Sequence, residues 1–237
     1  MPEGNDPSFE AARQLWAGRF QGVISTHCAA EPGYPFGSVV PFCLDRNGLP
    51  VLLFSHLAQH ARNLEADPRC ALTVHEAVPG DVQQSQRLTC IGTCAPCNAD
   101  AQALRRYLSY FPGGRIYAEQ LNFRPYRLMP KRCHYNGGFA AARWLGRERI
   151  LRHSTLDEDA EATLASALAR THGPRLAALH PPLDPGETDA TRIAGIDPWG
   201  LDLARGERLR RISFPRAMAD PAVIGTYLDS LPAEPAR

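Results

Sequence analysis

The chain has 237 residues, with 26 Lys and Arg against 25 Asp and Glu, which leaves a net charge of +1. This length suits one ordinary domain with a small appendage, or two small domains. The balanced charge supplies no global field for nucleic acid or for an anionic membrane, so neither is an expected partner and any anion site must be local. We find no apolar run of about 18 residues and no charged-then-apolar leader, and we therefore expect a cytoplasmic protein.

The first part of the chain alternates between strand patterns and turn signals. Strand composition appears in "FQGVISTHCA", and then in "YPFGSVVPFCLD" and "LPVLLFS", which the turn signal "RNG" joins into a predicted hairpin. After a short polar helix, two more strands are predicted in "CALTVHEA" and "RLTCIGTCAPC". These segments favour a mainly β domain.

A helix and a final strand region complete this part. The helix is predicted in "NADAQALRRYLSYFP", with Asn98 as its cap and Ala101, Leu104 and Leu108 on its buried face. Strand character returns in "YRLMPKRCHYNGGFAAARWL". About six strands with three short helices predict a small β-barrel with helices over its openings, spanning residues 8–151.

Residues 152–237 are expected to form a small α+β domain. Its helix begins at a capping-box spacing, Thr155 to Glu158, and is expected to end at Gly173. Three short strands with turns at "DPWG" and "RGE" follow, and "DPAVIGTYLDSL" predicts a closing helix. The predicted core stripe comprises Ile193, Ile196, Leu201, Leu203, Leu209 and Ile212. We expect this domain to have a structural or gating role, because its polar residues converge at no recognisable spacing.

The polar helix in "FSHLAQHARNLEADPRCALTV" is the first candidate site. We expect it to open on Ser55, to bury Leu57, Ala61 and Leu64, and to present Gln59, Arg62 and Asn63 on another face with His60 beside them. A helix N-terminus with an adjacent Arg forms a cradle for a phosphate group. The alternative is a solvated amphipathic helix whose polar face binds nothing.

Cysteine and histidine are the other candidate ligands. Seven Cys in a chain without an export signal favour reduced thiols. A zinc site at Cys90, Cys94 and Cys97 would need Cys133 or His134 as a further ligand, and we favour small buried strand residues over any metal site. His27, His56, His75 and His134 lie in or beside strands as expected structural residues, although haem iron needs only one neutral imidazole.

Two segments carry a resemblance to a known superfamily. "HARNLEADPR" and "NGGFAAARWL", together with "GYPFGSVVPFCLD", resemble the flavin-binding split barrel of the pyridoxamine 5'-phosphate oxidase-like superfamily, and most closely its haem-utilisation branch. "GIDPWGLDL" and "LRRISFP" are similar to the small C-terminal module of that branch. The resemblance implies a split β-barrel with a small C-terminal α+β domain, and it covers about residues 20–231.

The resemblance also implies a cofactor site. The main chain of Ser38, Val39 and Val40 would hydrogen-bond the edge of an FMN ring, and its phosphate would be held by a set comprising Ser55, Gln59, His60 and Arg62. Catalytic residues are not identified. The strand "SVVPF" lacks the basic residues of the true oxidases, Gln59 and His60 replace an Arg/Lys pair, and the basic substrate motif has no match. We therefore do not expect authentic pyridoxamine phosphate oxidation.

Two functions remain open from the sequence. The first is an FMN-dependent oxidoreductase acting on a small molecule that the sequence does not name. The alternative is a haem-binding or haem-degrading protein that uses the same barrel dimer interface, and a barrel that has lost both ligands is a third. The resemblance implies a two-fold homodimer, with apolar faces of "RLTCIGTCAPC" and "CALTVHEA" at the contact. The C-terminal helix lacks the His-containing run of the branch, so it supplies no implied ligand.

Overall fold

The computed structural model describes residues 7–76, 81, 83–138, 142–184 and 186–232. The chain divides into two compact units, Met1–His153 and Ser154–Arg237. This division lies two residues beyond the boundary expected after residue 151.

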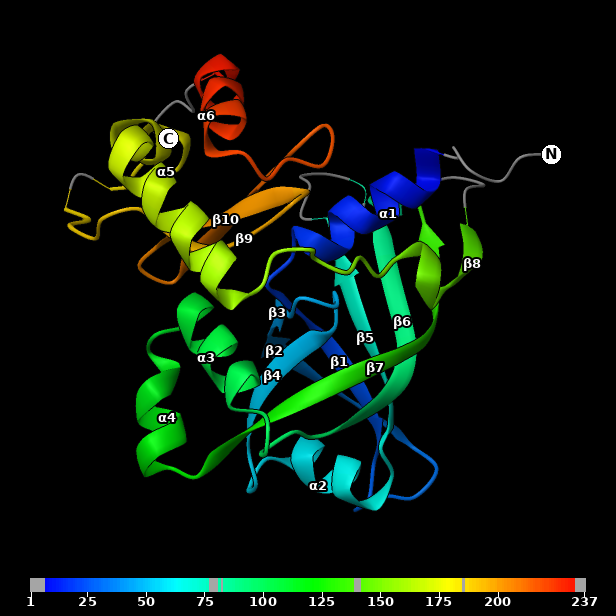
Figure 1. Cartoon of the computed structure of the whole chain (residues 1–237). Coiled ribbons are helices and arrows are strands. Elements are labelled where there is room, and N and C mark those ends of the chain that lie inside the picture. The colour runs from blue at the N-terminus through cyan, green and yellow to red at the C-terminus, as the bar shows by residue number, and fades with distance from the viewer. Residues whose placement is uncertain (1–6, 77–80, 82, 139–141, 185, 233–237) are drawn as a thin grey trace. The chain divides into compact units, whose positions relative to one another are not determined.

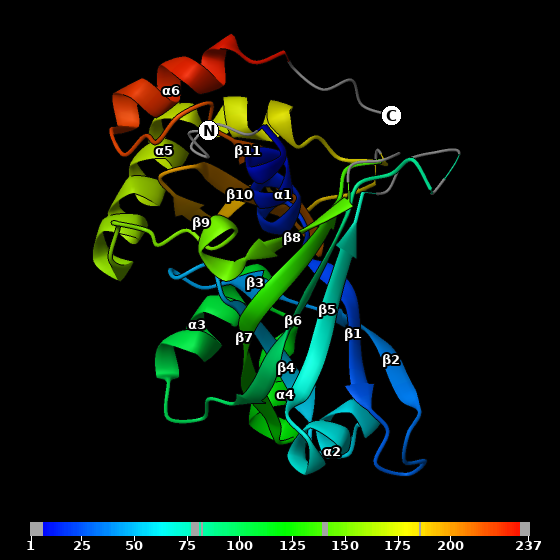
Figure 2. The ribbon, with the colours of Figure 1, turned by 90° about the vertical axis from the view of Figure 1, so that its right-hand side faces the viewer.

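The first unit is built on one curled antiparallel sheet of eight strands, and the split-barrel prediction is confirmed (Figure 1 and Figure 2). The strand order is β2-β1-β5-β6-β7-β4-β3, and β8 pairs with β7. The strands are β1 (Gln21–His27), β2 (Pro35–Pro41), β3 (Cys43–Leu44), β4 (Pro50–Ser55), β5 (Arg69–His75), β6 (Arg87–Pro96), β7 (Phe123–Asn136) and β8 (Ala142–Gly146).

The expected hairpin in this sheet is smaller than its sequence pattern suggests. The segment "YPFGSVVPFCLD" forms two strands, because β2 pairs with β1 and only the short β3 pairs with β4. Pro41 ends β2, and proline lacks the N–H that a continuous ladder needs. Gly137 and Gly138 of the resembled "NGGF" turn follow β7, while Phe139 lies outside the described residues.

The described residues of the first unit form four helices: α1 (Pro7–Ala17), α2 (Gln59–Ala66), α3 (Ala101–Tyr110) and α4 (Gly114–Gln120), with a 3₁₀ turn η2 (Arg147–Arg149) after β8. In Figure 1, α1 and α2 lie at opposite ends of the sheet. The details predicted for α3 are wrong. Its cap is Asp100, whose carboxylate accepts from two helix N–H groups, and its buried residues are Ala103, Tyr107 and Tyr110. Shifting the start by two residues moves the buried stripe with it.

The inner face of the curled sheet forms the core of this unit. Ile24, Leu72, Leu88 and Leu128 have no exposed surface, and Trp16 of α1 is 1% exposed. Alternate residues of the same strands point outward, as the period of two in a strand requires.

Two cysteines of the core differ from the prediction of reduced thiols. Cys90 of β6 and Cys133 of β7 are register partners and are disulfide-bonded. The prediction could not include this pair, because the sequence does not show which strands are neighbours. Cys70 and Cys94 are buried free thiols, as expected of small strand residues. Burial and a hydrogen bond with Cys70 raise the pKa of the Cys94 thiol, and the hydrogen bond has the larger effect.

The second unit is the expected small α+β fold. Its sheet has the order β11-β10-β9, from β9 (Arg192–Asp197), β10 (Gly200–Arg205) and β11 (Arg208–Ser213), with helices α5 (Glu158–Leu179) and α6 (Pro221–Ser230). Asp157, not Thr155, caps α5, and the helix bends at His172 and continues beyond Gly173. Of the predicted stripe, Ile196, Leu201, Leu203 and Ile212 are buried, while Ile193 and Leu209 are partly exposed.

Candidate functional site

The polar segment around α2 begins differently from its prediction. Ser55 is the last residue of β4, and its Oγ accepts a hydrogen bond from the Leu57 N–H at 3.2 Å. The helix itself begins at Gln59, after Ala58, which makes no side-chain capping bond. Ser55 therefore shapes the strand-to-helix turn and does not open the helix.

The buried face of α2 also differs in two positions. Ala61 and Leu64 are buried as predicted, but Leu57 is 64% exposed because it precedes the helix. Asn63 is fully buried instead of facing solvent. Its Nδ2 donates to Thr26 Oγ1 at 2.9 Å, and its Oδ1 accepts from the Ala29 N–H at 2.9 Å. Asn63 ties α2 to the end of β1, so it is unavailable to a ligand.

The remaining cradle residues are only partly brought together. His60 Nδ1 lies 3.2 Å from Ser38 Oγ, and the His60 ring lies 4.3 Å from the Phe54 ring. Burial lowers the pKa of His60, which favours the neutral imidazole. Gln59 Nε2 donates to Asn63 Oδ1 at 2.8 Å, so its amide is also engaged in the fold. Arg62 is exposed.

The two valines of the proposed ring contact point in opposite directions. Val39 is 75% exposed, whereas Val40 is 2% exposed and belongs to the core. The Val40 side chain is therefore unavailable to a ligand, and any contact of Val40 with a flavin would have to come from its main chain. The FMN site predicted from the sequence, with three residues at the ring edge and four at the phosphate, therefore remains a prediction. The contact of Ser38 with His60 is the one side-chain hydrogen bond observed between the two groups among the described residues.

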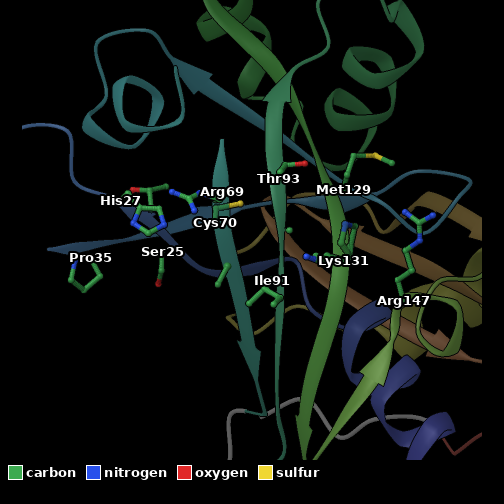
Figure 3. A pocket seen from close by; sticks show the side chains of 14 residues that line it. Ser25, His27, Pro35, Arg69, Cys70, Ile91, Thr93, Met129, Lys131 and Arg147 are labelled. Carbon is green, nitrogen blue, oxygen red and sulfur yellow. The ribbon is translucent and has the colours of Figure 1, made fainter. Parts of the chain in front are cut away.

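A larger candidate site lies on the outer face of the sheet, where the sequence prediction placed none. A cavity of about 780 Å³ opens there, within the usual range for small-molecule sites. We call it the outer-face cavity, and Figure 3 shows the side chains around it. It is lined by Ser25, Thr26, His27, Pro35, Arg69, Cys70, Ala71, Ile91, Gly92, Thr93, Met129, Pro130, Lys131 and Arg147.

Strand alternation explains most of this lining. Ser25 and His27 of β1, and Arg69 and Ala71 of β5, are outward residues that alternate with the buried residues of the same strands. Ile91 and Met129 add apolar surface, with exposed fractions of 36% and 43%. The floor of the cavity is therefore apolar, although it lies on the solvent side of the sheet.

A β-bulge adds a cation to the cavity. In the pairing of β6 with β7, Ile91 is opposite Arg132 and Gly92 is opposite Pro130, so Lys131 is the extra residue. A bulge of this kind redirects a side chain. Gly92 permits the close approach, because a Cβ there would lie 2.2 Å from the Met129 carbonyl oxygen. Lys131 is exposed and lines the cavity.

The charges around the cavity are not equivalent. Arg69 is held by Asp67, with Nε lying 2.9 Å from Asp67 Oδ1, and this hydrogen bond lowers the pKa of the Asp67 carboxyl. Within the described part of the chain, the side chains of Lys131 and Arg147 make no hydrogen bond or ion pair. His27 lies beside Arg69, on the side opposite Lys131 (Figure 3). The cavity combines an apolar floor, one exposed imidazole and two uncommitted cations.

The other candidate ligands lie elsewhere or are engaged. The His134 ring packs edge-on against Trp144, at 5.1 Å between centroids, and His75 Nδ1 lies 3.0 Å from the Glu76 carbonyl oxygen. Among the described residues, no three His, Cys, Asp or Glu side chains are grouped as a metal site. Across those same ranges, no helix is both long and apolar enough to cross a bilayer.

Comparisons with known proteins agree with this architecture. A family model described as pyridoxamine 5'-phosphate oxidase matches residues 9–135. A curated protein of Arabidopsis thaliana named "Non-canonical heme oxygenase HOZ, chloroplastic" is 33% identical over 135 residues, which cover 56% of this chain and 41% of that protein. The matched region thus spans less than half of the relative's length.

Solved structures show the same fold. A protein of unknown function from Agrobacterium tumefaciens has a TM-score of 0.76 at 24% identity, with 98% of each chain covered. A structure described as a heme binding protein from Mycobacterium smegmatis has a TM-score of 0.57 at 22% identity, covering 96% of this chain and 99% of that one.

Proposed function

The chain belongs to the pyridoxamine 5'-phosphate oxidase family, and we propose that it is a haem-binding protein of that family, with the ligand in the outer-face cavity. The observation that carries the proposal is the composition of this cavity: an apolar floor with His27 on one side and Lys131 and Arg147 on the other. Haem has a planar apolar ring, an iron that accepts imidazole, and two carboxylates.

Each group of the cavity has a role toward such a ligand. Ile91 and Met129 exclude water from one face of the ring, since both present apolar surface outward. His27 is exposed and offers an imidazole nitrogen to the iron. When bound, haem supplies a redox-active iron centre. The name of the 33% identical relative supports haem as the ligand and makes haem degradation the reaction to assay.

Haemin titration followed by difference absorption tests this function. The wild-type protein should give a saturable change in the Soret band. His27→Ala should alter the position of that band and weaken binding by about tenfold or more, because the iron loses a nitrogen ligand. His75→Ala is the matched control, since it removes an exposed imidazole from the neighbouring strand β5 that does not line the cavity, and it should leave the spectrum unchanged. A wild-type protein without saturable binding would contradict the proposal.

FMN is the second candidate, and a specific contact favours it. Ser38 Oγ lies 3.2 Å from His60 Nδ1, and Arg62, two residues further along α2, is exposed. A guanidinium can hold two phosphate oxygens in one fork. If this cradle holds the phosphate, Arg62→Ala weakens FMN binding about tenfold to hundredfold. Flavin fluorescence titration measures this loss. Equal affinities of wild type and variant would exclude the cradle.

The homodimer expected from the sequence also has a candidate surface. Val23 and Val39 are register partners on the outer face, with exposed fractions of 37% and 75%, and Trp144 is 48% exposed. We propose that a second copy covers this face and closes the outer-face cavity. Light scattering at micromolar concentration should give a dimer for the wild type and a monomer for Val39→Glu. A monomeric wild type would contradict this assembly.

A further inference from the structure

The outer-face cavity is lined by basic side chains from three elements. These are Arg69 on β5, Lys131 on β7 and Arg147 on the turn after β8. Arg69 is matched by Asp67, which accepts from it at 2.9 and 3.0 Å. Because that charge is already compensated, Lys131 and Arg147 are the two cations of the cavity that are left for a ligand.

These two cations lie close together through the pairing of β7 with β8. Arg132 is opposite Gly146, so Lys131 and Arg147 each lie one residue beyond a register pair, on the side of the cavity away from β1. The bulge at Lys131 directs its side chain outward beside Met129. Figure 3 shows both cations across the cavity from His27 and Arg69. A bulge and a 3₁₀ turn thus deliver two charges to one edge of an apolar surface.

We infer that Lys131 and Arg147 form a carboxylate clamp that fixes the orientation of the ligand. This inference rests on the proposed haem function and adds a specificity to it: the ligand must carry two carboxylates on one edge. Arg147 binds one carboxylate as a planar fork, and Lys131 binds the other as a point charge. The clamp holds the carboxylate edge toward β8, and the opposite part of the ring then lies over Ile91 toward β5 and β1.

The spacing of the strands agrees with such a ligand. Strands β1, β5, β6 and β7 are consecutive neighbours in the sheet. Three inter-strand steps of ~4.8 Å separate His27 from Lys131. A flat tetrapyrrole spans this width when its carboxylates are at one end, whereas a compact dicarboxylic acid does not. The clamp therefore selects for tetrapyrroles that retain free carboxylates.

The test compares three probes: haemin, haemin dimethyl ester and metal-free protoporphyrin. Lys131→Ala and Arg147→Ala should each weaken binding of haemin and of protoporphyrin about tenfold to hundredfold. Neither variant should change the affinity for the dimethyl ester, because it lacks the charges that the clamp binds. Lys131→Arg should restore haemin binding, since it keeps the charge and the donors. Haemin and its ester are followed by absorption, and protoporphyrin by fluorescence.

Arg132→Ala is the matched control. Arg132 is adjacent to Lys131 in the bulge but lies over the Trp144 ring, 5.2 Å from its centroid, and does not line the cavity. The control removes the same charge from the same strand and should bind all three probes as the wild type does. If Lys131→Ala and Arg147→Ala behave like this control while the wild type binds haemin, the clamp is wrong and the haem function stands. A wild type that binds no probe overturns both.

Discussion

The α2 segment and the outer-face cavity differ in how their polar residues are used. In the polar helix α2, Gln59 donates to Asn63, and Asn63 in turn bonds to Thr26 of β1 and to the Ala29 N–H just beyond that strand. In the cavity, His27 and Lys131 come from strands with ordinary sequence patterns and are exposed. A cluster of polar residues on one helix can therefore serve the fold, while single outward residues on neighbouring strands form a candidate site.

The largest expected change in stability comes from substituting Gly92, which lies opposite the β-bulge of β7. Gly92→Ala places a Cβ 2.2 Å from the Met129 carbonyl oxygen, so the backbone of β6 or β7 must shift. We expect a loss of about 3 kcal/mol in the free energy of unfolding, together with weaker haemin binding. Denaturant unfolding measures the first change.

Gly37→Ala is the control for this variant. Its Cβ would meet only Val23 Cγ1 at 3.5 Å, an ordinary contact on the edge strand β2. It should cost much less than Gly92→Ala. Equal losses of stability for the two variants would show that the close approach of β7 to Gly92 does not require a glycine.

The next effect concerns the structural role of α2. Asn63→Ala removes the partner of the Ala29 N–H and of the Thr26 hydroxyl, and we expect a loss of about 2 to 3 kcal/mol in stability. Arg62→Ala, one residue earlier on the exposed side, should change stability by less than about 0.5 kcal/mol. Thermal or denaturant unfolding of both variants compares the buried face of α2 with its exposed face. An Asn63→Ala variant as stable as the wild type would show that the hydrogen bonds of Asn63 do not stabilise the fold.

The smallest effect is a pH dependence at His60. Burial lowers the pKa of His60 in the folded state, so the unfolded chain takes up a proton first as the pH falls below about 6.5. The contribution of neutral His60 to stability is complete above that pH and declines as the pH falls toward the folded-state pKa. His60→Gln should flatten this part of the stability profile. A profile identical to that of the wild type would contradict it.

This lowered pKa also sharpens the flavin alternative. The sequence alone suggests that His60 strengthens phosphate binding as the pH falls below about 6.5. In the fold, protonation of free His60 requires a lower pH than that. An increase of FMN affinity as the pH falls below about 6.5 that disappears in His60→Gln would favour the cradle, and a flat affinity over that range would favour a structural His60.

The sequence could predict the elements better than their edges. Strand alternation and the turns at "DPWG" and "RGE" identified β9, β10 and β11. The sequence pattern predicts starts for α2 and α3 that are too early, at Ser55 and Asn98, because a Ser or Asn before a helix pattern can belong to the preceding turn. A shift of a few residues in the predicted helix start rotates the predicted buried face, so that Leu57 is predicted to be buried and Asn63 to be exposed.

The cavity could not be read from any single segment. Its residues extend from Ser25 to Arg147, and their proximity depends on the strand order and on one extra residue in β7. One signal was available: in "STH" and "RCA" the residues that alternate with the core, including His27 and Arg69, must share the outer face. The disulfide of Cys90 with Cys133 was missed for the same reason, since it depends on the register of β6 with β7.

A crystal structure of the wild-type protein with haemin would locate the ligand directly. We expect the ring to lie over Ile91 and Met129, with His27 bonded to the iron and the two carboxylates at Lys131 and Arg147. A ring held at α2 near Ser38 and His60, or a protein that binds no haemin under conditions where it binds FMN, would contradict it.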